Sequence, residues 1–474
     1  MCSYFFLQAF SLLRPTGQLG LVATNSISEG DTRESGLQHI IKSGGIVFTA
    51  VRSRKWPGQA SLEVAHVWIR KGAWIAPCTL DGQHVTKITA FLLAEEHLFS
   101  TPHRLHENMG WGLEGSHVNG LGFMLEPLEA KRLIDQDKKN RNVIFPFLNG
   151  EDLNSSPTQK ASRWVINFSD WPLKRLTSNR SDKDESANGI VKMDYVGPVA
   201  ADFPDCLAIV EERAKPEREL NGSETLRRLW WRFKRPTIDL YNAICGSARV
   251  LVCSEVTKHL AFCFVQNGMV YSANLAVFPK ASLAAFAVLQ SSIHDLWART
   301  FSSHLETRLK YSQGNAFETF PFPTAYKDFG HVNPTESNLA VLGEQYHEFR
   351  QQSLSDRNIG LTTIYNRFHA ANESSADIQK LRQLHIKMDN AVTAAYGWTD
   401  LDLDHGFHET KQGVRYTISE VARREALTRL LKLNHERYDA EVNRGLHAKK
   451  KPKSSKKSAK TDDGVTLFES QGEE

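Results

Sequence analysis

The sequence has no long hydrophobic run and no recognisable export signal. Among its 474 residues, the longest nearly apolar stretch extends from Ala281 to Leu289, far short of the ~20 residues that a membrane-spanning helix needs. The first residues carry no basic stretch ahead of an apolar segment, which a secretory signal would have. These absences predict a cytoplasmic protein without a membrane partner.

Cysteines are also few, and their arrangement does not suit disulfides or zinc. None of the six stands in a C-x-x-C pair, and Cys245, Cys253 and Cys263 fall within strand-like apolar runs. Paired cysteines at short spacing are the usual sign of a zinc or redox site, and cytosolic proteins keep their thiols reduced. We therefore expect reduced and buried thiols.

Common catalytic motifs are missing as well. The chain contains no G-x-x-x-x-G-K-[ST], no H-E-x-x-H and no G-x-S-x-G, which excludes the usual phosphate loop, zinc protease and serine hydrolase patterns. The glycine-rich stretch at 110–122 follows no apolar strand and opens no helix, which favours an irregular connector over a phosphate-binding loop. The sequence thus assigns no catalytic residue.

Histidines do not indicate a metal site either. His97, His103, His106 and His117 are irregularly spaced in a polar segment, which favours solvated side chains over a metal cluster. His405 and His408 in HGFHET are interpreted as packing and hydrogen-bonding residues between helices and not as metal ligands. No metal is therefore expected.

Charge gives no direct indication of a partner. The net charge is +4, and the stretch from 446 to 474, with seven lysines and five acidic residues, contributes +2 of it. Nucleic-acid binding would therefore depend on local basic patches and not on bulk charge. The stretch at 446–474 is rich in lysine and serine without an apolar anchor, so we expect a disordered lysine-rich tail.

Periodicity predicts an α/β unit over residues 1–130. An apolar helix at 1–14 is followed by a strand at 18–24, a helix at 31–43 and strands at 46–53 and 62–69. This order predicts the C-terminal half of a doubly wound, Rossmann-like sheet, with 18–24 as a buried parallel strand. Because so apolar a helix stands at the start, we expect a further N-terminal half to cover it.

Two further units follow. Residues 140–325 are predicted to be α+β, with strands at 163–168, 249–253, 260–265 and 269–278 and a helix at 283–300. Residues 335–445 are predicted to form a small all-helical domain, because apolar side chains recur at helical spacing from Ile378 to Ala395 and Gly397 follows as a C-cap. Thr417 and Glu420 have the spacing of a capping box ahead of the last helix.

Successive motifs resemble the MmeI-like DNA methyltransferases, in order and over nearly the whole chain. These motifs are LGLVATNSISEGDTRESGL, WPGQASLEVAHVWIRKG, FLNGEDLNSSP, RWVINFSDW, YNAICGSARVLVCSEV, ETFPFP, GLTTIYNRFH and AYGWTDLDLDHGFHETKQGVRYTISEVARRE. The family comprises large single-chain restriction-modification proteins that methylate adenine N6 in DNA. The resemblance implies that residues 1–130 are the end of a methyltransferase core, that 140–325 recognise the DNA target and that 335–445 are the helical C-terminal domain.

The family's catalytic motifs are absent from this sequence. The resemblance implies that S-adenosylmethionine sits on a glycine-rich loop after the first strand of the core, and that an Asn-Pro-Pro-aromatic motif after the fourth strand holds the target amine. Both would lie ahead of residue 1, and the only Asn-Pro pair, Asn333-Pro334, lacks the second proline. An exocyclic amine must be oriented at the cofactor methyl, so we expect no cofactor binding and no methyl transfer by this chain alone.

The resemblance also implies a target-base pocket. Asn25 and Ser26 follow the strand at 18–24, where open α/β sheets bind ligands. Trp56 occupies the turn where related methyltransferases stack a flipped base on an aromatic ring. Alternatively, Trp56 closes the core of a hairpin.

Two segments are candidates for DNA contacts. RRLWWRFKR places Arg228, Arg232 and Arg235 among indoles, which suits phosphate contact or, alternatively, an amphipathic helix with buried tryptophans. If the segment at 304–311 is extended, Glu306, Arg308 and Lys310 project from one face and can contact a base pair. In the alternative, Glu306 and Arg308 form an ion pair on the protein surface.

The sequence therefore predicts an α/β plus α+β protein, N-terminally truncated, that recognises double-stranded DNA for adenine-N6 methylation. A preceding segment or a separate partner chain would supply the catalytic motifs. The alternative is a non-enzymatic DNA-binding remnant or specificity subunit.

Overall fold

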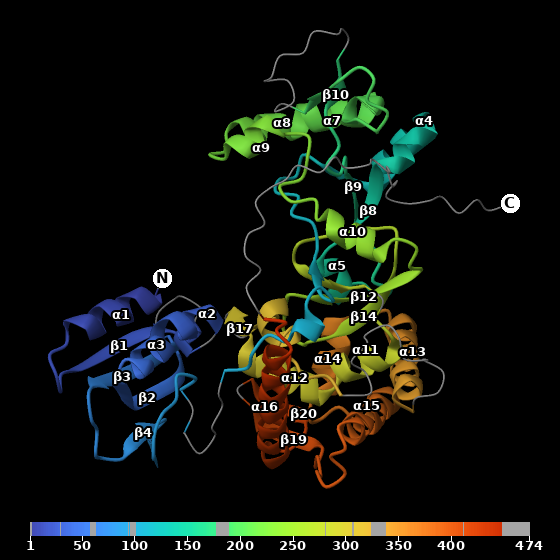
Figure 1. Ribbon diagram of the computed structural model, residues 1–474. Coiled ribbons are helices and arrows are strands. Elements are labelled where there is room, and N and C mark those ends of the chain that lie inside the picture. Colours follow the sequence, from blue (N-terminus) through green and yellow to red (C-terminus); the bar gives the residue numbers. More distant parts are fainter. Residues whose placement is uncertain are drawn as a thin grey trace.

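The computed structural model describes residues 2–28, 30–56, 63–92, 94, 101–176, 189–279, 281–305, 308–323, 338–410 and 412–447. Figure 1 shows an N-terminal α/β part, drawn in blue, beside a helical body that includes α16 (Glu420–Asn443). A lobe with α4 (Pro127–Gln136) and α7 (Pro204–Arg213) extends from that body. The predicted disordered tail lies outside the described residues.

The N-terminal part is a five-stranded sheet with helices. Its elements are α1 (Cys2–Leu12), β1 (Gln18–Thr24), η1 (Asn25–Ser28), α2 (Gly30–Arg33), η2 (Glu34–Gln38), α3 (His39–Lys42), β2 (Gly45–Lys55), β3 (Glu63–Lys71), β4 (Cys78–Leu80) and β5 (Gln83–Val85). The strand order is β1-β3-β2-β4-β5. Because β3 is antiparallel to both β1 and β2, those two strands run in the same direction, joined by the helical segment between them.

β1 is an edge strand that pairs antiparallel with β3, which corrects the expectation of a buried parallel strand. Within the described residues it pairs with β3 alone, and its exposed and partly buried positions alternate. Val22 is 55% exposed, and Tyr4, Phe5 and Leu12 of the neighbouring α1 are exposed as well. The interior of this part is a separate small core that includes Phe6 and Ile69. A mixed α/β unit is thus present, whereas the doubly wound sheet stays a prediction.

The middle of the chain builds two four-stranded sheets, β14-β12-β16-β6 and β15-β8-β9-β7, and a small sheet β13-β18-β17. The strands are β6 (Leu113–Glu114), β7 (Met124–Leu125), β8 (Ile144–Leu148), β9 (Arg163–Ile166), β10 (Lys174–Arg175), β11 (Ile190–Val191), β12 (Arg249–Ser254), β13 (Val256–Thr257), β14 (Phe262–Gln266), β15 (Val270–Tyr271), β16 (Leu275–Phe278), β17 (Ser303–Leu305) and β18 (Arg308–Lys310). The helices besides α4 and α7 are η3 (His106–Asn108), η4 (Lys138–Asn142), α5 (Gly150–Ser155), η5 (Ala200–Asp202), α8 (Lys215–Glu219), α9 (Glu224–Arg228), α10 (Ile238–Ile244), α11 (Leu283–Gln290), α12 (Ser292–Phe301) and η6 (Gln313–Phe317).

Three predictions for this region need correction. The run at 269–278 is two strands, β15 and β16, and the helix at 283–300 is two helices, α11 and α12. The helix is interrupted because Ser291 caps α12, its side chain accepting a hydrogen bond from the backbone N of His294. Cys245 is exposed at the end of α10, while Cys253 and Cys263 are buried free thiols as expected.

The glycine-rich stretch at 110–122 packs closely against the turn between β15 and β16. A Cβ atom on Gly115 would lie 2.2 Å from the carbonyl oxygen of Ser272. The backbone N of Ser116 donates to the carbonyl of Tyr271 at 2.7 Å. These contacts agree with the prediction that the stretch at 110–122 is an irregular connector. Gly115 has no side chain, so the two backbone segments can approach closely.

The C-terminal region consists of α13 (Asn338–Arg357), α14 (Leu361–Phe368), α15 (Ala376–Ala395), a hairpin of β19 (Gly406–Thr410) and β20 (Gly413–Thr417), and α16. The predicted apolar stripe is buried on α15, and Gly397 follows it with φ +77°. The hairpin corrects the prediction of an all-helical unit. Thr417 ends β20, and Ser419 is the N-cap of α16, accepting from the backbone N of Ala422.

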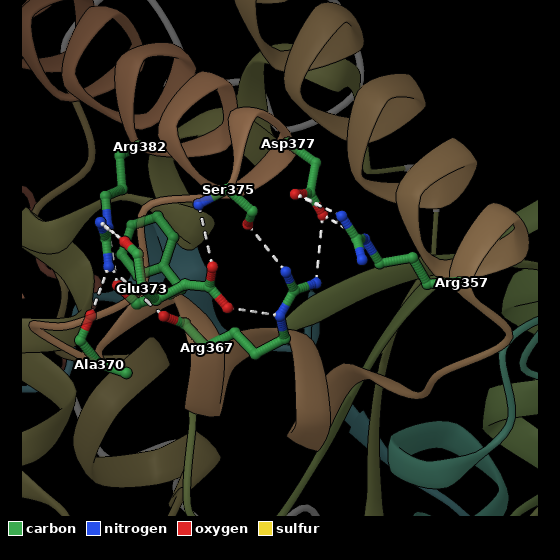
Figure 2. Close-up of polar contacts among 8 residues, drawn as sticks. Arg357, Arg367, Ala370, Glu373, Ser375, Asp377 and Arg382 are labelled. Carbon is green, nitrogen blue, oxygen red and sulfur yellow. Dashed lines mark hydrogen bonds and ion pairs between the residues drawn. The ribbon is translucent and has the colours of Figure 1, made fainter.

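One continuous core joins the middle and C-terminal regions, since a single cluster of buried side chains extends in sequence from Phe91 to Leu431. The predicted domain boundaries stay predictions. Figure 2 shows the polar network at the turn between α14 and α15, where Arg367 contacts Glu373 at 2.8 Å and Asp377 at 3.1 Å. Hydrogen bonds from Ser375 and Arg367 lower the pKa of Glu373 to about 2. This network fixes the approach of the two helices.

Candidate nucleic-acid interface

The residues predicted for the target-base pocket lie at the ends of two strands. Asn25 and Ser26 begin η1 directly after β1, and Ser26 Oγ lies 2.7 Å from Thr24 Oγ1. Trp56 follows β2 and is 42% exposed, which favours an accessible indole over a place in a hairpin core. Because β1 and β2 run in the same direction, all three residues lie at the same end of the sheet, where the two strands finish. Base stacking by Trp56 stays a prediction.

The basic segment RRLWWRFKR divides into buried and exposed side chains. Trp230 and Trp231 are buried, and Trp231 Nε1 donates to the carbonyl of Trp171 at 3.0 Å. Arg232 Nε donates to the same carbonyl at 2.8 Å, and burial lowers the pKa of Arg232. The tryptophans therefore belong to the core, as in the alternative interpretation, although the helix itself ends at Arg228.

The other two predicted phosphate ligands in this segment, Arg228 and Arg235, are exposed. Arg228 is the last residue of α9, and Arg235 forms an ion pair with Glu114. A free guanidinium on the surface can bind a phosphate, whereas a buried one engaged with a carbonyl cannot do so without rearrangement. Of the three predicted phosphate ligands, Arg228 is the best placed, and a DNA role for any of them stays a prediction.

The hairpin of β17 and β18 carries the predicted base-contacting residues. Arg308 and Lys310 are exposed and alternate with buried Leu309, so their side chains leave one face of β18, as the extended pattern predicted. The register pairs Leu305 with Arg308. Glu306 lies outside the described residues, so its pairing with Arg308 stays a prediction.

The structure brings the hairpin and the predicted base pocket together. β17 contacts η1, the segment that begins with Asn25, and Figure 1 shows β17 next to the blue N-terminal part. The basic segment after α9 lies in the lobe, away from that junction. Two of the three predicted groups therefore share one region of the molecule.

A cavity of about 770 Å³ lies at this junction. Its walls include η1, β2, β4 and β5 of the N-terminal part, β17, α12, α14 and α15 of the body, and the hairpin β19–β20 with α16. The charged residues that line it are Arg52, Asp81, Asp295, Arg299, Glu409, Arg415, Glu420, Arg423 and Arg424. Sequence reasoning missed this site because its walls come from segments far apart in the chain. The only local indication is the arginine-rich motif at 413–425.

A serine, a histidine and an aspartate meet in the cavity wall without forming a nucleophilic site. Ser292 Oγ and Asp389 Oδ2 both face Nε2 of His385, at 3.0 and 3.5 Å. A catalytic triad needs the aspartate on the other ring nitrogen, and in the described structure Nδ1 of His385 has no partner. Asp389 instead accepts from the backbone N of Ser292 at 2.9 Å and from His405 Nε2 at 2.8 Å. The cluster anchors the N-terminus of α12, and His405 has the hydrogen-bonding place expected for it.

Glu441 of α16 fixes the connector that leads from the N-terminal part. Its carboxylate accepts from the backbone N of His106 at 2.8 Å and of Glu107 at 3.1 Å. His103 stacks on Tyr438, with ring centroids 4.0 Å apart. His103 is therefore packed against α16 and not solvated, whereas the side chain of His106 is exposed as expected, and His97 lies outside the described residues.

The described ranges contain no group of three His, Cys, Asp or Glu side chains that could hold a metal ion. No helix in them is long and apolar enough to cross a membrane.

Comparison with known proteins finds one matching family model and a solved structure with a similar fold. Residues 239–324 match the family model described as MmeI, target recognition domain. The solved structure of the type IIL restriction-modification enzyme MmeI in complex with DNA superimposes with a TM-score of 0.62 at 16% identity, covering 92% of this chain and 52% of that one. The type IIG restriction endonuclease BpuSI gives a TM-score of 0.28 at 10% identity, covering 83% of this chain and 49% of the BpuSI chain. No curated protein matches the chain.

The match to MmeI shows a shared fold. The chain spans about half the length of the MmeI chain it matches. The matched segment contains β12 to β18, so the hairpin with Arg308 lies inside the stretch that is similar to the MmeI target recognition domain. The resemblance to MmeI-like proteins that the motifs indicated is thereby confirmed.

Proposed function

We propose that this chain recognises a DNA target for adenine-N6 methylation in a restriction-modification or related defence system. The observation that supports it best is the contact between β17 and η1. It sets the hairpin with Arg308, inside the matched recognition segment, beside the strand ends that carry Asn25. Groove contacts that identify bases would then lie next to the place where a flipped adenine is held.

The turn after β1 does not fit an S-adenosylmethionine site. Each turn that would hold the cofactor should contain glycines that let the backbone approach it, but β1 leads into Asn25-Ser26-Ile27-Ser28. We therefore propose that the cofactor and the amine-binding motif belong to a preceding segment or a separate chain. The open edge of β1 offers backbone N–H and C=O groups to such a neighbouring strand.

DNA binding is tested with the purified chain and mixed-sequence duplexes, by fluorescence anisotropy over a range of salt concentrations. Binding that weakens as salt rises is expected, since phosphate contacts release counterions. Lys432→Gln serves as a control, because this lysine is 78% exposed on α16 and lies outside the cavity. Absence of binding at low salt would contradict the proposal.

Methylation is tested separately, by co-expressing the chain with the product of the reading frame directly upstream. Labelled methyl transfer to DNA by the pair, and not by either product alone, is the expected result. DNA binding without methylation in any combination would instead favour a non-enzymatic specificity protein, the alternative that the sequence left open.

A further inference from the structure

Arg415 is a buried arginine without an acidic partner. It lies on β20 in the wall of the cavity and is 8% exposed. Among the described residues, its guanidinium makes a single hydrogen bond, from Nη2 to Nδ1 of His259 at 2.8 Å. No carboxylate among the residues that the structure describes forms an ion pair with it. A buried charge left in this condition is destabilising by several kcal/mol unless an anion offsets it.

His259 positions Arg415 without neutralising it. The Oδ1 atom of Asn366 accepts from Lys258 Nζ at 2.7 Å and lies 2.9 Å from His259 Nε2, so Nε2 must donate to it. The other ring nitrogen is then the acceptor for Arg415. Burial and the nearby Arg415 lower the pKa of His259 to about 3, so its ring is neutral at physiological pH. The imidazole therefore orients the guanidinium and leaves its charge uncompensated.

Carboxylates that line the cavity are already engaged, including Asp295, whose charge offsets only part of the effect of burial on the pKa of Arg415. Both oxygens of Asp295 accept from Arg299 Nε, at 3.0 and 2.8 Å. Glu420 contacts Arg423 at 2.7 Å and Arg424 at 3.0 Å. Glu409 also lines the cavity, and its backbone carbonyl accepts from Arg423. Within the described residues, Nη1 of Arg299 and Nε of Arg423 are buried without a hydrogen-bond partner, which leaves further donors in the same wall.

Arg382 shows how a purely structural arginine is satisfied in this protein. It is also 8% exposed, yet it donates to the backbone carbonyls of Phe368, Glu373 and Ala370, each at 2.9 Å. Figure 2 shows its guanidinium among these acceptors. Arg415 has no comparable set, although it is just as buried.

We propose that the cavity binds a phosphate group through Arg415, with Arg299 and Arg423 supplying further donors. A guanidinium fork matches the oxygens of a phosphate in geometry and charge, and such charge-assisted hydrogen bonds are the strong ones. The phosphate belongs either to the DNA backbone, because Asn25 and His304 line the same cavity, or to a free phosphate-bearing molecule. The site does not depend on the proposed methylation function.

Inorganic phosphate is the first probe, in thermal unfolding at constant ionic strength with chloride as the reference. A saturable rise in Tm is expected for the native chain, since a ligand that binds only the folded state stabilises it. Arg415→Gln removes the charge but keeps a donor for His259. It should lose the phosphate-dependent rise while its Tm without phosphate stays equal or increases.

The opposite pattern would overturn the proposal. If Arg415 only supports the fold, Arg415→Gln lowers Tm without phosphate and keeps any phosphate-dependent rise. Arg415→Lys keeps the charge without the fork and should bind phosphate several-fold more weakly, which provides a second test if Arg415→Gln fails to fold. Lys432→Gln should respond to phosphate as the native chain does.

A DNA titration distinguishes the two phosphate sources. If the DNA backbone occupies the cavity, Arg415→Gln lowers the salt slope of duplex binding by about one unit of log affinity per log salt, and inorganic phosphate competes with DNA. If a free molecule is the ligand, duplex binding is unchanged while the phosphate-dependent rise in Tm is lost. No phosphate effect on Tm and no change in duplex binding would refute the site. Failure of DNA binding altogether would contradict the proposed function but leave the phosphate titration decisive.

Discussion

Acidification is expected to destabilise the folded chain through its buried histidines, among them His259 and His294. Burial also lowers the pKa of His347 to about 3 and lowers that of His369. His294 is fully buried, with its ring 4.6 Å from that of Phe320 and Nε2 3.1 Å from the hydroxyl of Tyr311. Burial lowers the pKa of His259 and of His294 to about 3, from an ordinary value of 6.5. As pH falls below 6.5, the unfolded chain binds protons that the folded chain does not, so stability is lost between pH 6.5 and about 3.

The size of this loss follows from linkage. One pH unit below the unfolded pKa, each histidine that stays neutral in the folded state lowers the free energy of unfolding by about 1.4 kcal/mol, and His259 and His294 together by about 3 kcal/mol. Asp389 does not interfere. Its pKa in the folded state is lowered by the nearby His385 and His405 against the opposing effect of burial, so its own contribution is lost only at more acidic pH.

Urea unfolding followed by intrinsic fluorescence at pH 7.5, 6.5 and 5.5 measures the effect. His294→Phe removes one titrating group, so the loss of stability between pH 7.5 and 5.5 should shrink by about 1.4 kcal/mol. Tyr311→Phe is the control. It removes the hydrogen bond to His294 but keeps the imidazole, and should lower stability equally at each pH. A loss in His294→Phe as large as in the native chain would refute the reasoning.

Three further predictions concern DNA. Exchanging Glu306→Lys together with Arg308→Asp in the complete methylating system should change the methylated motif at one position, because a good base contact discriminates by about 1 to 3 kcal/mol. Methylome sequencing of both systems checks this. An identical motif would show that the two residues form only a surface ion pair. Arg228→Gln should reduce the salt slope of duplex binding without affecting Tm, whereas Arg232→Gln should lower stability by about 1 to 3 kcal/mol because the carbonyl of Trp171 loses a charged donor. The purified chain alone should transfer no labelled methyl group from S-adenosylmethionine to DNA, and measurable transfer would show that the catalytic elements have been misplaced.

Local sequence patterns predicted much of the secondary structure. The strand at 18–24 has the predicted bounds, and the stripe beginning at Ile378 is the buried face of α15. These predictions succeed because helical and strand periodicities are local properties. Failures occurred where one polar side chain decides the outcome. Ser291 divides the helix at 283–300, and Ser419, next to Glu420, caps α16 in place of Thr417.

The candidate site was only partly predictable. Asn25 could be proposed because it stands in a recognisable motif, and Arg308 because the alternation of Arg308 and Lys310 around Leu309 is a local property of a strand. The cavity around Arg415 could not be predicted. His259 precedes Arg415 by 156 residues, and no local pattern indicates that the two side chains meet or that no carboxylate completes the contact.

Selection from a pool of randomised DNA duplexes is the most direct test of the central claim, that this chain recognises a DNA target. The native chain should enrich one short motif, and single mismatches in it should weaken binding by about 1 to 3 kcal/mol each. Arg308→Gln should relax the preference at one position, while Lys432→Gln enriches the native motif. A pool that remains random after repeated rounds, despite salt-dependent binding, would contradict the claim and leave only nonspecific affinity.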